Sequence, residues 1–115
     1  MDSTEIKKSQ IQNIDKIVDY TANSVVIKSI INRPTGNISA VAFDSGEVLA
    51  GKISPFDTFI QVIDGKAEIV IDNNSNLLKT GESIIIPAHS RSTTKANVRF
   101  KMLSTIIKSG YEEFS

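Results

Sequence analysis

The sequence contains no cysteine and no tryptophan, and its 115 residues include a single histidine, His89. Without cysteine the chain cannot form disulfides, thiolate zinc sites, iron–sulfur clusters or a thiol nucleophile. A single histidine provides only one imidazole for metal binding or for acid–base chemistry. We therefore predict neither a metal centre nor a cofactor.

An excess of either charge is also missing, because 13 Lys and Arg residues balance 13 Asp and Glu residues. Nucleic acids and anionic membranes are bound through a surplus of basic residues, so neither is a predicted partner. No apolar run approaches the ~18 residues of a membrane span, and the polar first residues do not read as a targeting signal. The cytoplasm is the expected location. The length suits one domain. We predict a flexible tail over residues 1–12 and a single domain over residues 13–115.

One short helix is predicted near the N-terminus, over residues 14–20. Ile14, Ile17 and Val18 fall at i, i+3 and i+4, which places them on one helical face. Asn13 is a suitable N-cap for this helix.

From residue 25 onward the pattern is that of β-strands. Short runs of β-branched and aromatic residues alternate with turn signals, which occur at residues 33–36, 44–46, 64–65, 72–74 and 80–81. The run Ile84–Ile86 is apolar on both faces, and Val98–Ile107 predicts the last strand, with Arg99 and Lys101 on a solvated face. Many strands without crossover helices predict an all-β antiparallel sandwich or barrel.

The clearest turn signal is Asp64-Gly65. A two-residue type I′ hairpin needs positive φ at both central positions, which Asp-Gly tolerates. The flanking runs 58–63 and 66–71 are strand-like. The sequence therefore predicts a hairpin between these two runs.

The spacing of glycines resembles the first motif of small single-domain cupins of the cupin-2 type. That motif has a glycine, five residues, His-x-His, a glutamate and a closing glycine. Gly46 and Gly65 stand in the two glycine positions. Lys52 and Ser54 stand where the family has its histidines, and Thr58 stands where it has the glutamate.

The second cupin motif, from a glycine through Pro-x-Gly to a histidine, is matched in the same way. Gly81 and Pro87 are retained, while His89 takes the position of the second glycine and Ser92 that of the histidine. The resemblance covers roughly residues 25–107. It implies an all-β cupin-type jelly-roll β-barrel, or double-stranded β-helix, with one short N-terminal helix.

The same resemblance argues against the metal of the family, because its ligand positions are degenerate. A lysine ammonium and neutral hydroxyls are poor substitutes for imidazole and carboxylate at a divalent metal. The resemblance implies instead a binding cavity in the barrel, lined by Lys52, Ser54, Thr58, His89 and Ser92. Lys52 would pair with an anionic group of the ligand, or its ammonium would extend into water or pair with Asp57. His89 would act at the cavity or would be a solvent-facing loop residue.

The sequence favours a small-molecule-binding or accessory module over an enzyme, and no catalytic residue is assigned. Two alternatives remain open. One is a metal-independent isomerase or epimerase that moves protons with Lys52 or His89. The other is a metal-dependent isomerase or dioxygenase with unusual ligands. A homodimer is also expected, from the apolar run Ile84–Ile86, from a strand before Pro34 that could extend a neighbour's sheet, and from the pairing habit of the family.

Overall fold

Residues 5–108 are described by a computed structural model of the chain. Within this range the chain is almost entirely β-structure, which confirms the predicted fold class. The elements are η1 (Ile14–Lys16), β1 (Val25–Arg33), β2 (Gly36–Phe43), β3 (Val48–Ala50), β4 (Thr58–Ile71), β5 (Asn74–Lys79), β6 (Ser83–Ile86), β7 (Ser92–Lys95) and β8 (Phe100–Ile107).

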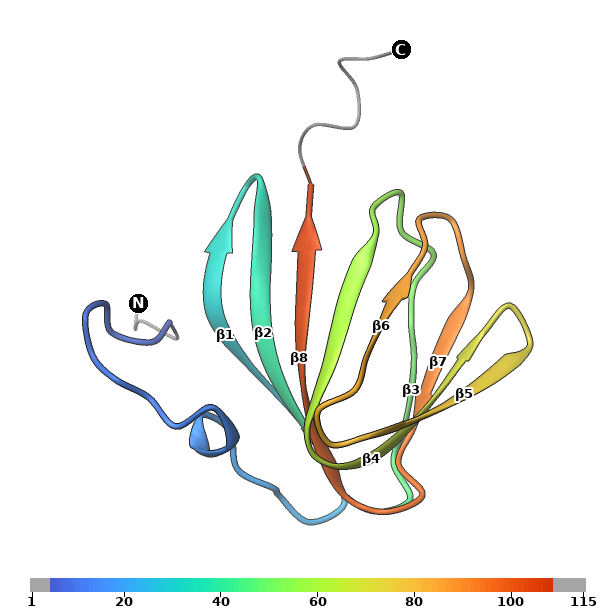
Figure 1. The fold of residues 1–115 in the computed structure, drawn as a ribbon, viewed down its shortest axis with the longest axis horizontal. Helices are drawn as coiled ribbons and strands as arrows, with labels where there is room; N and C mark the ends of the chain where they lie inside the picture. Colours follow the sequence, from blue (N-terminus) through green and yellow to red (C-terminus); the bar gives the residue numbers. More distant parts are fainter. Residues whose placement is uncertain (1–4, 109–115) are drawn as a thin grey trace.

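The strands pair antiparallel in one curled sheet with the order β1-β2-β8-β4-β7-β3, while β5 and β6 also pair with β4 (Figure 1). Strand β4 belongs to both halves of this sheet. Its first half pairs with β8 and β6, and its second half pairs with β5 and β7. In Figure 1 the strand descends and then swings sideways at its midpoint to lie beside β5. This turn brings the two halves of the sheet face to face.

The hairpin predicted at Asp64-Gly65 is wrong, because both residues lie inside the continuous strand β4. The pairing of β4 with β8 shifts register between Val62 and Asp64, and Gly65 has φ +79°. These features bend the strand without reversing it. The two-residue hairpin is instead at Asp72-Asn73, where φ is +47° and +71°, and it connects β4 to β5.

The predicted N-terminal helix is reduced to the single 3-10 turn η1, and Asn13 makes no capping hydrogen bond with its side chain. The apolar residues of this segment pack on the outer face of the sheet. Val18 is buried against Ala40 and Ala42 of β2, with Ile17 beside it. Burial against the sheet therefore decides the conformation of the segment, as tertiary contacts often override a short helical pattern.

The same N-terminal segment also covers Lys101, which was wrongly predicted to be solvated. Lys101 is only 8% exposed, and its Nζ donates a hydrogen bond of 2.6 Å to the carbonyl oxygen of Asp15. The ammonium lies 4.9 Å from the ring centre of Tyr20, and the Arg99 guanidinium lies 4.5 Å from the same ring. Partial burial and a 2.6 Å hydrogen bond donated to Asp64 raise the pKa of Tyr20. The segment is thus held to the sheet by polar as well as apolar contacts.

The main core lies between the two halves of the sheet, towards one end of the barrel. Phe43 and Phe100 stack at its centre with ring centroids 4.6 Å apart, and Val62, Ile69 and Met102 are buried around them. No helix within residues 5–108 has the length and apolar character needed to cross a membrane. The candidate site adjoins this core, because Ile60 and Met102 belong to both the core and the cavity lining.

Candidate functional site

The candidate site is a cavity of about 280 Å³ between the two halves of the sheet. One wall comes from β4, β6 and β8, and the other comes from β3, β7 and the loops beside them. The apolar part of its lining consists of Leu49, Phe56, Ile60, Ile86, Pro87, Met102 and Ile106.

Four of the five residues that the sequence predicts for the cavity do line it: Lys52, Ser54, Thr58 and Ser92. Lys52 is exposed at the mouth, and Ser54 and Thr58 are half-buried. Ser92 is buried, and the backbone at Gly51 passes close to it. The amide of Gly51 donates to the Ser92 carbonyl oxygen at 2.9 Å, and a Cβ on Gly51 would lie 2.6 Å from the Ser92 hydroxyl. Glycine at position 51 therefore leaves the space that this hydroxyl occupies.

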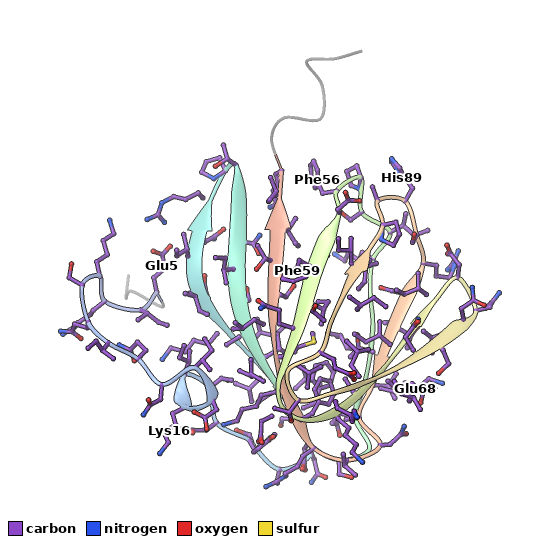
Figure 2. The ribbon with its side chains drawn as sticks, in the orientation of Figure 1. Glu5, Lys16, Phe56, Phe59, Glu68 and His89 are labelled. Carbon is purple, nitrogen blue, oxygen red and sulfur yellow. The ribbon has the colours of Figure 1, made fainter. Side chains whose placement is uncertain are left out.

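His89, the fifth predicted residue, is exposed and is not part of the cavity lining. It lies at the tip of the loop between β6 and β7 (Figure 2). Its φ of +67° is the left-handed conformation that the turn glycine of the cupin motif would adopt. Its amide donates to the Ser54 carbonyl oxygen at 2.6 Å, and the neighbouring Ala88 amide donates to Asp57 at 2.8 Å. The backbone of His89 thus supports the mouth of the cavity, while its imidazole faces away.

Three further hydroxyl residues line the cavity and were not identified from the sequence: Ser90, Thr94 and Ser104. Together with Thr58 and Ser92 they form what we call the hydroxyl cluster. Thr94 could have been found from strand alternation, because it lies two residues after Ser92 and so shares its face. Alternation also places Ser104 on the face of Phe100 and Met102, but the strand pattern does not show whether that face meets filled core or a cavity at this residue.

The side chains of the hydroxyl cluster make no hydrogen bond with other residues of the described range 5–108. Within the same range, no fully buried side-chain nitrogen or oxygen lacks a partner. The five hydroxyls are therefore open to the cavity and free to bond with what it contains. Ser54 differs, because its hydroxyl accepts a 3.0 Å hydrogen bond from the Phe56 amide.

Lys52 is the one charged residue among the described residues that line the cavity. No carboxylate occurs among these lining residues, and the Asp57 carboxylate, which is not among them, accepts from the Ala88 amide. The cavity is smaller than a second pocket of about 550 Å³ beside β5, lined in part by Lys66, Leu77 and Val98. We place the site in the barrel because hydroxyls from both walls converge on this one space.

The residues present do not fit the divalent metal of the cupin resemblance. The four positions of the metal ligands hold Lys52, Ser54, Thr58 and Ser92, whose ammonium and neutral hydroxyls are weak donors for such an ion. No group of three His, Cys, Asp or Glu side chains that could hold a metal occurs within residues 5–108. No metal-dependent step is therefore derived for this site.

Similar folds are found among solved structures. A conserved protein of unknown function from Streptococcus pyogenes has a TM-score of 0.86 and 23% identity, over 91% of this chain and 92% of that one. A cupin superfamily protein from Desulfitobacterium hafniense has a TM-score of 0.84 and 21% identity, over 90% and 95%. A cupin 2 conserved barrel domain protein from Leptotrichia buccalis has a TM-score of 0.78 and 28% identity, over 81% and 45%. A scan of protein-family models and a search of curated proteins find no match.

Proposed function

We propose, from the premise that this chain has the cupin fold, that it is a metal-independent module which binds a small molecule inside its barrel. The observation that carries the proposal is the cavity of about 280 Å³, whose lining includes five hydroxyls without a hydrogen-bond partner among residues 5–108. Buried polar groups are normally hydrogen-bonded, to protein, water or ligand. A cavity that keeps so many of them open is suited to binding a polar ligand.

Binding accounts for the lining better than catalysis by proton transfer does. An isomerase of that kind needs an acid and a base that reach the same substrate. Lys52 is the ionisable side chain in the described lining, and the His89 imidazole is exposed outside it. A metal-dependent reaction is separately testable, since elemental analysis of the purified protein would find stoichiometric iron, manganese, nickel or zinc.

The binding proposal is tested by closing the cavity from within. Thr94→Leu adds bulk to the lining from β7, while Thr93→Leu, at the adjacent residue on the opposite face of the same strand, is the matched control. A metabolite library is screened by thermal shift, because a ligand present at 100 times its Kd stabilises the folded state by about 2.7 kcal/mol. We expect compounds that raise the Tm of the wild type and of Thr93→Leu but not of Thr94→Leu. Shifts that survive Thr94→Leu, or a library without any shift, would contradict the proposal.

We also propose that the protein is a homodimer, through an apolar row on the outer face of the sheet. The strand registers align Ile31, Ile38, Thr105, Phe59 and Ile85 side by side across β1, β2, β8, β4 and β6. The N-terminal segment covers another part of this face, yet Phe59 stays 38% exposed and Ile85 57% exposed. An apolar row of this kind is self-complementary across a two-fold axis.

The dimer is tested by light scattering at tens of micromolar. Ile85→Glu should shift the mass from dimer to monomer, because it would place a charge in the apolar row. Leu77→Glu is the control, since Leu77 is also apolar and is more exposed than Ile85 but lies on β5, away from the row. A monomeric wild type, or equal effects of the two variants, would remove the proposal.

A further inference from the structure

We infer that the ligand of the barrel cavity is a small hydroxylated carboxylate, of about the size of a six-carbon sugar acid. Its carboxylate pairs with Lys52 at the mouth, and its hydroxyls bond with the hydroxyl cluster inside. This inference rests on the proposed binding function and specifies the chemistry of the ligand.

The sign of the ligand charge follows from the lining. Lys52 is the charged group that the described lining contributes, and it carries no ion pair within the described residues. An anion inside the cavity therefore meets one ammonium and no carboxylate from this lining, because Asp57 is not part of it and accepts from the Ala88 amide. A single lysine, without arginine or a helix N-terminus, suits one negative charge better than the two of a phosphate monoester.

The hydroxyl content of the ligand follows from the hydroxyl cluster, whose members come from both walls: Thr58 on β4, Ser92 and Thr94 on β7, Ser104 on β8, and Ser90 just before β7. An apolar ligand would displace water from these groups and leave them unpaired. Each unpaired group lowers affinity by roughly fivefold to a hundredfold. A ligand with several hydroxyls of its own can donate to and accept from the cluster.

The size of the ligand follows from the volume. The cavity of about 280 Å³ is the space of about nine water molecules at ~30 Å³ each. One molecule of about a dozen non-hydrogen atoms fits it, with its apolar ring or chain edges against residues such as Ile60, Ile86 and Met102.

The test uses four probes built on a six-membered ring that separate charge from hydroxyl content: glucuronate, glucose, glucosamine and cyclohexanecarboxylate. Their affinities are measured by calorimetry at pH 6, where glucuronate is an anion and glucosamine a cation. We expect glucuronate to bind about fivefold more tightly than glucose, as one exposed charge pair allows. Glucosamine should bind most weakly among the three sugars, and cyclohexanecarboxylate should bind at least about fivefold more weakly than glucuronate.

Two variants assign these preferences to residues. Lys52→Met should abolish the preference for glucuronate over glucose while glucose binding is retained. Thr94→Val, which removes one hydroxyl at constant shape, should reduce the preference for glucuronate over cyclohexanecarboxylate, and Thr93→Val should not.

The outcomes separate this inference from the proposed function. Equal affinities for glucuronate and glucose, or a preference that Lys52→Met leaves unchanged, would overturn the inference even when binding is still blocked by Thr94→Leu. The same holds when none of the four probes binds but another library compound does so in a cavity-dependent way. A wild type that binds neither the probes nor any library compound would overturn the proposed function as well.

Discussion

Gly65 is the residue at which β4 turns from one half of the sheet to the other, and we predict that alanine is tolerated worse there than at Gly46 or Gly81. All three glycines have φ between +79° and +91°, where an L side chain costs roughly 1–2 kcal/mol. At Gly46 and Gly81 a Cβ would meet no atom within 4 Å. At Gly65 it would lie 2.9 Å from the Cβ of Phe100 and 3.0 Å from its Cα, so β8 would have to move.

Overpacking of this kind adds roughly 1–3 kcal/mol, so Gly65→Ala should lower the free energy of unfolding by about 2–5 kcal/mol. Each control should lower it by about 1–2 kcal/mol. At roughly 4 °C per kcal/mol for a domain of this size, the expected loss of Tm is about 8–20 °C for Gly65→Ala and about 4–8 °C for the controls.

Far-UV circular dichroism is a suitable measurement of these losses, because the chain has no tryptophan to report unfolding by fluorescence. Urea unfolding of the same variants gives the free energies directly. Equal losses in the three variants would mean that β8 does not constrain Gly65, and our explanation of the bend in β4 would then be wrong.

Two further predictions concern polar contacts away from the cavity. Lys101→Met should lower the free energy of unfolding by about 1.5–3 kcal/mol, because the buried ammonium donates to the Asp15 carbonyl oxygen. Lys95→Met, at an exposed lysine, should change it by less than about 0.5 kcal/mol in the same urea titration. A hydrogen bond from the Asn23 amide, first among several causes, lowers the pKa of Asp44. This carboxylate therefore contributes stability above its unfolded pKa of about 3.9, which is lost as the pH falls through the lower folded pKa. Asp44→Asn should be less stable than wild type at pH 7 and should approach it in strong acid; a constant difference from pH 7 to pH 2 would exclude this role.

The turn positions of the cupin motifs were predictable because they depend on backbone conformation, which few residues satisfy. Gly46 and Gly81 both adopt positive φ at turns, as their spacing indicates. His89 takes the same conformation at the position of a motif glycine. The spacing of the motif therefore predicted the backbone conformation of His89 correctly, but it could not show that the imidazole would face away from the cavity.

The two wrong predictions of local structure have a common cause. Asp64-Gly65 is a strong hairpin signal in isolation, and Ile14, Ile17 and Val18 have helical spacing. In the folded chain Gly65 is needed where β4 passes close to Phe100, and Val18 is needed to cover β2. Both roles depend on contacts distant in sequence, which local patterns do not contain.

The cavity divides into a part that the sequence could predict and a part that it could not. Positions 52, 54, 58 and 92 were predictable because an alignment of motifs carries the location of a site even when its chemistry has changed. Ser104 was not, because alternation with Phe100 and Met102 indicates the inner face of β8 but does not show that the barrel leaves a cavity there. Its position changes the interpretation of the site. The four motif positions alone show only that the metal ligands expected from the cupin resemblance are absent. With Ser90, Thr94 and Ser104 added, both walls carry hydroxyls, and this lining is the basis of the polar ligand that we propose.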